Sequence, residues 1–184
     1  SSELTKLAKE SPVGANGLMF TSYILGERAP HADSNIRGSF IGIDAMHTRA
    51  DFARAVMEGI TFGFRDLMNV YLENGQSFDK IIAIGGGAKS EPWKQMQADM
   101  YNRTVVSMKN EQGPGMGAAM IAAVGLGWFK DFEECADVFV KFDKEYQPIP
   151  ENVDKYTKGY EIFKQVYGRT ADLSKSLLKL HNED

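Results

Sequence analysis

The stretch that decides the fold reads Lys80-Ile-Ile-Ala-Ile-Gly-Gly-Gly-Ala-Lys-Ser-Glu-Pro-Trp93. A short apolar run, three consecutive glycines and a helix-start sequence follow one another, so the stretch predicts a buried strand that turns directly into a helix. Ser90 and Glu91 stand just before Pro92, a setting that is typical of a helix N-terminus.

The three glycines of this turn allow two interpretations. Because glycine has no Cβ, the backbone at Gly85, Gly86 and Gly87 can adopt positive φ or approach a flat ligand closely. In open α/β sheets, ligands bind beyond the carboxyl ends of strands, where this turn would lie. A tight loop that is imposed by close packing explains the glycines equally well.

The elements around the turn alternate between strand and helix. The sequence predicts, in order, strand 80–84, helix 91–102, strand 104–108 and helix 115–127. This order is typical of a layered α/β domain. We found no repeat and no flexible linker in the 184 residues, so we expect one domain over 1–184.

The first third of the chain reads as β-rich. Short apolar runs at 17–23 and 38–43 are bounded by turn-forming residues, as strands usually are, and an irregular loop at 26–37 connects them. The loop gathers the titratable or charged residues Glu27, Arg28, His31, Asp33 and Arg37. They suit acid–base chemistry or contact with a polar substrate. The loop offers no matched carboxylate pair and no metal spacing, so we favour a structural or positioning role, with ion pairs around Pro30.

A long helix is predicted from Arg49 to Glu73. One apolar stripe at helical spacing consists of Phe52, Val56, Ile60, Phe64, Leu67 and Tyr71. A second stripe holds only small residues, namely Ala55, Gly59 and Gly63. Glycine inside a helix costs roughly 1 kcal/mol relative to alanine. We therefore expect another element, such as a sheet, to pack closely on the second stripe.

After Trp128 the pattern changes to helices alone. The sequence predicts helices at 132–142, 151–166 and 170–180, with no further strand. Trp93 and Trp128 lie at the ends of predicted helices, where we expect them to be packing anchors.

Composition excludes several classes of partner. The net charge is −4 and the pI is about 5.5, which argues against nucleic acid or an anionic membrane as the main partner. The longest apolar stretch, 116–129, is too short to cross a bilayer. The one cysteine, Cys135, has acidic neighbours that disfavour a reactive thiolate. A structural thiol and a reducing cytoplasm are expected.

A second glycine motif follows strand 104–108. The run Gly113-Pro-Gly115-Met-Gly117-Ala118 fits the pattern G-x-G-x-x-[GA] of dinucleotide-binding folds. Such a fold needs a second parallel strand that ends in Asp or Glu about twenty residues later. Here Glu133 and Glu134 fall in a predicted helix, so we do not expect an NAD enzyme. No zinc spacing, nucleophile elbow or phosphate-binding P-loop occurs in the sequence.

Five blocks of sequence, taken together, resemble the C-terminal half of the FGGY carbohydrate kinases. The blocks are Gly17-Leu-Met-Phe with Gly26-Glu-Arg-Ala-Pro-His, Ile36-Arg-Gly-Ser-Phe-Ile-Gly, Arg54-Ala-Val-Met-Glu-Gly-Ile-Thr-Phe, Gly85-Gly-Gly-Ala-Lys-Ser with Trp93, Gln95, Ala98 and Asp99, and Gly117-Ala-Ala. They stand in the family's order and cover nearly the whole chain. The wording of 26–38 is most similar to family members that phosphorylate xylulose, with gluconate kinases next.

The resemblance implies an α/β domain of the ribonuclease-H-like (actin/Hsp70-like ATPase) fold, with additional C-terminal helices. It implies ATP-dependent phosphorylation of a sugar hydroxyl, most simply of D-xylulose to D-xylulose 5-phosphate. By resemblance, Gly86, Gly87 and Ala88 would line adenosine through their backbone, and Gly85 would hold the turn. Ser90 or Glu91 would reach the adenine or ribose. Gly115 and Gly117 would permit close packing beside the nucleotide.

The resemblance also implies what this chain does not carry. In the family, the catalytic base, the Mg2+-handling acids and most sugar contacts lie N-terminal to this segment, so we name no catalytic or metal residue here. The expected partners are ATP or ADP, a pentulose sugar and the N-terminal domain of the same polypeptide, without which the chain should be inactive. A homodimer through the C-terminal helices stays open, as does a non-catalytic nucleotide-binding module of the actin-like superfamily.

Overall fold

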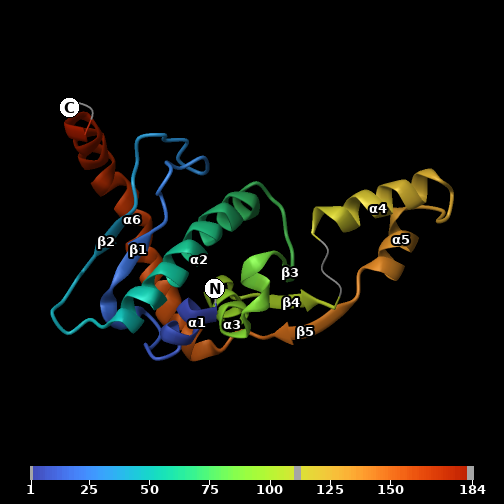
Figure 1. The fold of residues 1–184 in the computed structure, drawn as a ribbon, viewed down its shortest axis with the longest axis horizontal. Helices are drawn as coiled ribbons and strands as arrows, with labels where there is room; N and C mark the ends of the chain where they lie inside the picture. The colour runs from blue at the N-terminus through green and yellow to red at the C-terminus, as the bar shows by residue number, and fades with distance from the viewer. Residues whose placement is uncertain (1, 110–112, 182–184) are drawn as a thin grey trace.

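The predicted strand–turn–helix stretch forms as expected. In the computed structural model, which describes residues 2–109 and 113–181, β3 (Lys80–Ala83) leads into the turn and α3 (Glu91–Tyr101) leaves it (Figure 1). β4 (Thr104–Met108) lies parallel to β3, and α4 (Pro114–Gly125) follows. The strand–helix alternation predicted from 80 onward is therefore confirmed.

The sheet contains a strand that the sequence did not predict. β5 (Phe142–Tyr146) pairs antiparallel with β4, giving the strand order β3-β4-β5. The expectation of helices alone after Trp128 was wrong, because α5 (Phe132–Phe139) ends before this strand. β5 is charged and largely exposed, so it lacks the apolar alternation that marks a strand. It forms a strand because it pairs with β4, a contact that local sequence does not reveal. Being antiparallel, it does not supply the second parallel strand of a dinucleotide-binding unit.

The small-residue stripe of the long helix makes the expected close contact. α2 (Arg49–Glu73) packs against β1 (Met19–Thr21), which pairs antiparallel with β2 (Ser39–Ile41). A Cβ added at Gly59 would lie 2.1 Å from the backbone oxygen of Phe20. The strand crosses the helix where only glycine leaves enough room, so the interpretation of this stripe is confirmed.

Two helices differ from the prediction. The segments 151–166 and 170–180 belong to one continuous helix, α6 (Pro150–His181). The predicted break contains Gly168 but no proline, and a single exposed glycine does not end a helix. α1 (Ser2–Ala8) was not predicted, and it packs on α2. No helix among the described residues is long and apolar enough to cross a membrane.

A buried polar network ties α2, the N-terminal segment and α6 together. Glu58 is 4% exposed, and its Oε1 accepts hydrogen bonds from the Gly14 N–H (2.9 Å), Arg54 Nε (2.8 Å) and the Tyr156 hydroxyl (2.8 Å). Burial raises the pKa of Glu58, and the Arg54 guanidinium opposes that shift. Next to this network, Phe62 packs on Tyr156, Tyr160 and Phe163 of α6.

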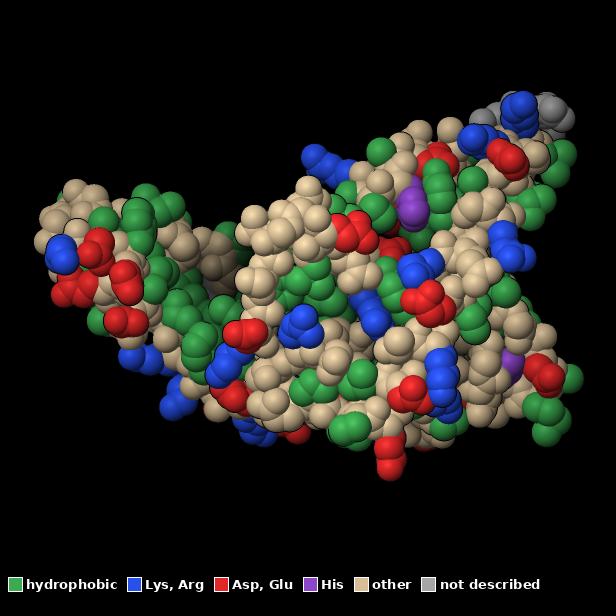
Figure 2. Space-filling model, turned by 180° about the vertical axis from the view of Figure 1, so that it is seen from behind, with side chains coloured by type: hydrophobic (Ala, Val, Ile, Leu, Met, Phe, Trp, Pro, Cys, Tyr) green, Lys and Arg blue, Asp and Glu red, His purple; other side chains and the backbone are tan. Residues whose placement is uncertain are grey.

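α4 and α5 pack on each other and stand to one side of the other elements (Figure 1). On the face shown in Figure 2, hydrophobic side chains gather at this end together with several acidic ones, and charges of both signs are interspersed over the rest. Trp128 is 73% exposed, so the expectation that it anchors packing was wrong. Cys135 is buried, which agrees with a structural thiol.

Candidate functional site

The glycine turn is built by backbone hydrogen bonds at the carboxyl end of β3. Gly85 has φ +79° and ψ −163°, a combination that is essentially restricted to glycine. A 3₁₀ turn, Gly86–Lys89, follows, in which the Ala88 N–H donates to the Gly85 carbonyl at 3.1 Å and the Ser90 N–H to the Gly87 carbonyl at 3.0 Å. These hydrogen bonds close the turn between β3 and α3.

The outer side of the turn is exposed at Gly85 and Gly86. A Cβ added at either residue would meet no atom of the described residues within 4 Å. Close packing therefore does not explain these two glycines, which was the alternative interpretation from the sequence. The turn presents side-chain-free backbone, beside which a flat ligand could lie without steric conflict.

The inner side of the turn is supported by Trp93. A Cβ at Gly87 would lie 3.4 Å from the indole ring. The indole Nε1–H donates to Thr61 Oγ1 at 2.9 Å, and the Thr61 hydroxyl donates to the Met57 carbonyl at 2.7 Å. Thr61 is fully buried in α2. The turn is thus fixed to α2 through one hydrogen-bonded aromatic side chain.

Ser90 and Glu91 both have structural partners. Ser90 is the N-cap of α3, and its Oγ accepts from the Trp93 N–H at 3.3 Å. Glu91 forms an ion pair with Lys144 of β5, whose hydrogen bond lowers the pKa of the Glu91 carboxyl group. The role that the resemblance gives these side chains at an adenine or ribose remains a prediction.

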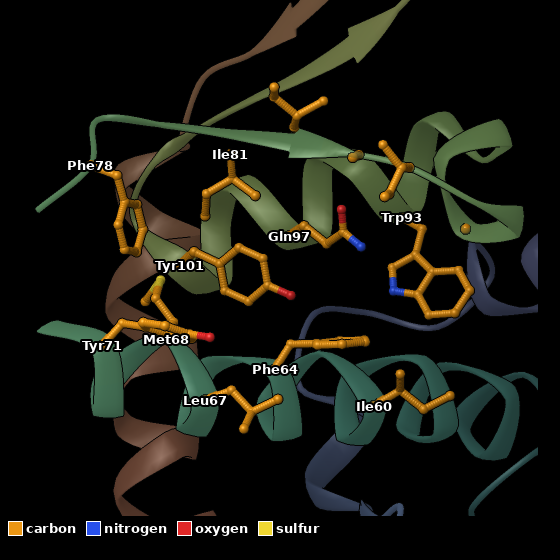
Figure 3. Close-up of a pocket in the computed structure, with 14 residues that line it drawn as sticks. Ile60, Phe64, Leu67, Met68, Tyr71, Phe78, Ile81, Trp93, Gln97 and Tyr101 are labelled. Carbon is orange, nitrogen blue, oxygen red and sulfur yellow. The ribbon is translucent and has the colours of Figure 1, made fainter. Parts of the chain in front are cut away.

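A cavity of about 510 Å³ lies beneath the turn, between α2 and the β3–α3 unit. Figure 3 shows Tyr101, Gln97 and Trp93 of α3 on one side of it and Phe64 of α2 on the other. The lining is mostly apolar, and it comprises Ile60, Phe64, Leu67, Met68, Tyr71, Phe78, Ile81, Ile82, Ala83, Ile84, Gly87, Trp93, Gln97 and Tyr101. Burial raises the pKa of the Tyr101 hydroxyl.

The cavity and the turn are adjacent but distinct. Of the six predicted site residues, only Gly87 lines the cavity, whereas Gly85, Gly86, Ala88, Ser90 and Glu91 surround the turn. The supporting pair Trp93 and Thr61 was not recognised as part of the site. Their signal in the sequence is weak, because only the fold brings α2 against α3.

The remaining candidates lie away from the turn or have structural roles. Loop 26–37 is held by hydrogen bonds to its own backbone and to α6, where the Tyr167 hydroxyl donates to Asp33 and Ser174 Oγ accepts from the Arg37 N–H. The ion pairs expected around Pro30 are not seen among the described residues. Glu27 accepts from two backbone N–H groups, and Arg37 donates to the carbonyls of Ser34 and Ile36. His31 stacks on Tyr167 with the ring centroids 3.7 Å apart.

The second glycine motif shows no close packing. Added Cβ atoms at Gly115 and Gly117 would meet no described atom within 4 Å, so the close packing expected there is not seen. Within residues 2–109 and 113–181, no group of three or more His, Cys, Asp or Glu side chains is arranged to hold a metal ion.

The described elements form a mixed α/β domain. Residues 1–126 match the model of the FGGY family of carbohydrate kinases, C-terminal domain. The chain therefore belongs to the FGGY carbohydrate kinases, which confirms the resemblance seen in the sequence.

The similar proteins are sugar kinases. The xylulose kinase of Staphylococcus epidermidis is 49% identical over 180 residues, which cover 98% of this chain and 36% of that protein. Two crystal structures from Lactobacillus acidophilus, a ligand-bound xylulose kinase and a gluconate kinase, each show 34% identity and a TM-score of 0.85. Each comparison covers 92% of this chain and 34% of the other. The chain thus spans about a third of the length of these proteins.

Proposed function

We propose that this chain is the adenosine-binding part of a sugar kinase that phosphorylates D-xylulose with ATP. The observation that carries the proposal is the exposed glycine turn at the carboxyl end of the parallel strand β3, where a Cβ added at Gly86 would meet no described atom within 4 Å. This is the place where α/β folds bind ligands. A ribonuclease-H-like fold for the intact domain, with the N-terminal half of the polypeptide beside it, is part of the same proposal.

The nucleotide would rest on backbone rather than on catalytic side chains. Gly86, Gly87 and Ala88 would face the adenosine, Gly85 would hold the turn, and Ser90 or Glu91 would reach the base or ribose by exchanging its present partner. Phosphoryl transfer depends on positioning and on charge neutralisation at the γ-phosphate. The described residues offer no metal-binding cluster for this, so the chemistry is assigned to the rest of the polypeptide.

Xylulose is the preferred sugar because a relative that covers 98% of this chain at 49% identity is a xylulose kinase. Gluconate is the second candidate, since the gluconate kinase structure matches as well as the xylulose kinase structure from the same organism. Most sugar contacts are expected outside this chain, so its residues do not decide between the two.

A sugar panel tests the proposal. The intact kinase polypeptide would be incubated with ATP, Mg2+ and either xylulose, gluconate, ribulose or glycerol, and ADP release would be followed. We expect release to be fastest with xylulose and absent when the 184 residues are assayed alone. A gluconate preference would select the second candidate, and nucleotide binding without turnover of any sugar would favour the non-catalytic module.

A further inference from the structure

A second cavity, of about 270 Å³, lies away from the glycine turn. Its walls come from the paired strands β1 and β2, from α2 and from α6, which pack together (Figure 1). We call it the β1–β2 cavity. Its lining is mostly apolar and includes Phe20 and Phe62. Five of the lining residues contribute no side chain, namely Gly14, Gly17, Gly42, Gly59 and Gly159.

Glu58 brings an unused hydrogen-bond acceptor to this cavity. The side chain is buried, and the hydrogen bonds that it accepts from the described residues all end on Oε1. The described side-chain atoms that are enclosed without a partner are Arg65 Nε and Nη1 and the Tyr146 hydroxyl, so Glu58 Oε2 is not enclosed. Because Glu58 lines the cavity, its free oxygen has access to the cavity.

The charges around Glu58 favour a neutral donor as its partner. The Arg54 guanidinium lies 2.8 Å from Oε1 and stabilises the ionised carboxylate, which is an acceptor only. Lys155 adds a second positive charge at the same end, where a Cβ at Gly14 would lie 3.2 Å from Lys155 Cε. A ligand cation would meet both positive groups, and a ligand anion would meet the carboxylate. A neutral hydroxyl group satisfies Oε2 without either conflict.

We propose that the β1–β2 cavity is a second ligand site, which binds a small neutral molecule made of an apolar ring and one hydroxyl group. The hydroxyl would donate to Glu58 Oε2, and the ring would lie among the apolar residues of β1, α2 and α6. An apolar cavity of about 150 Å³ is enough to hold one benzene ring, so a single ring fits here. A ring without a donor would leave Oε2 buried and unpaired, which is unfavourable.

Phenol and selective isotope labelling of glycine test the site in the complete kinase. We expect phenol to shift the amide signals of Gly14, Gly59 and Gly159, and to leave those of Gly85 and Gly86 unchanged. ADP, by contrast, should shift the signals of Gly85 and Gly86 if the nucleotide proposal is right, so the two proposals fail separately. Phenol that moves none of the cavity glycines would overturn the second site.

Fluorobenzene separates hydrogen bonding from simple filling of the cavity, because it has nearly the size of phenol and no donor. A hydrogen bond to a charged acceptor should make phenol bind roughly tenfold more tightly or better. In Glu58→Gln the second oxygen is replaced by an amide N–H₂ group, so this preference should disappear while the ring still binds. Equal affinities for the two probes in the parent protein, or an unchanged preference in folded Glu58→Gln, would contradict the proposal.

A second variant leaves Glu58 and its partners in place. Val166 is 4% exposed and lines the cavity, so Val166→Phe should fill the space and weaken phenol binding roughly tenfold or more. Leu173→Phe, at an exposed position on the same helix that does not line the cavity, should leave phenol affinity unchanged. The melting temperature of each variant reports folding. Parent-like phenol affinity in folded Val166→Phe would place the probe elsewhere and overturn the proposal.

Discussion

Gly86 is the residue whose substitution tests the proposed nucleotide site most sharply. Its φ is not positive, and an added Cβ would meet no described atom within 4 Å, so we expect the fold to accept a larger side chain. Gly86→Val should therefore leave the melting temperature nearly unchanged and weaken ADP binding by the intact kinase roughly tenfold or more, because about 1.4 kcal/mol of lost contact is a tenfold change. Calorimetric titration of ADP measures the effect.

The control for Gly86→Val is Gly168→Val, at an exposed position on α6 that is also free of neighbours within 4 Å. It should change neither stability nor ADP affinity appreciably. Unchanged ADP affinity in Gly86→Val would remove the outer side of the turn from the binding site.

Thr61 and Trp93 hold the turn from the inner side. Thr61→Val keeps the side-chain shape but removes the acceptor of the indole N–H, which is 2.9 Å away. A donor left unsatisfied in this half-buried setting costs about 1–3 kcal/mol, so urea denaturation should show a loss of this size. Trp93→Phe removes the donor as well, and the double variant should lose less than the sum of the two single variants. Strict additivity would show that the bond contributes nothing.

At the scale of elements, the close packing of α2 on β1 at Gly59 can be tested by substitution. Gly59→Ala would place Cβ 2.1 Å from the Phe20 carbonyl oxygen, whereas Gly63→Ala, one turn further along the helix, would place it 3.4 Å from Ser22 Oγ. We expect Gly59→Ala to destabilise the fold by about 2–3 kcal/mol because the strand must move away. Gly63→Ala should be neutral or stabilising by up to about 1 kcal/mol. Chemical denaturation of both variants checks this, and equal effects would contradict the packing described.

The N-terminus of α2 should make stability depend on acid. Hydrogen bonds from the Ser11 hydroxyl and the Thr48 N–H lower the pKa of Asp51 to about 2. A carboxyl group with a lowered pKa stabilises the fold above its unfolded pKa of about 3.9, and this contribution disappears as the pH falls toward 2. Asp51→Asn should therefore be less stable than the parent at pH 7, with a difference that shrinks below pH 4. A difference that is constant from pH 7 to pH 3 would assign the effect to packing alone.

The elements that could be predicted are those whose signal is local. Helix 49–73 and the strand–turn–helix stretch carry their own periodicity and end signals, and both formed within two residues of the expected bounds. β5 could not be predicted, since its charged residues become a strand only by pairing with β4. The continuity of α6 past Gly168 was missed because one exposed glycine weakens a helix without ending it.

In the candidate site, too, only the parts with a local sequence signal could be predicted. The Gly85–Gly87 turn was visible in the sequence because three glycines have few explanations. The cavity could not be predicted, because its walls come from α2, β3 and α3, which only the fold brings together. The apolar stripe of α2 gave a partial signal, because it is a second packing face beside the small-residue stripe that packs on β1.

At the scale of the whole molecule, the central proposal is that adenosine lies on the outer face of the glycine turn, in the complete kinase polypeptide. A crystal structure of the complete kinase with bound ADP tests this most directly. We predict that the adenosine lies against the backbone of Gly85–Ala88. Adenosine inside the cavity between Phe64 and Trp93, or at any site away from the turn, would contradict the account.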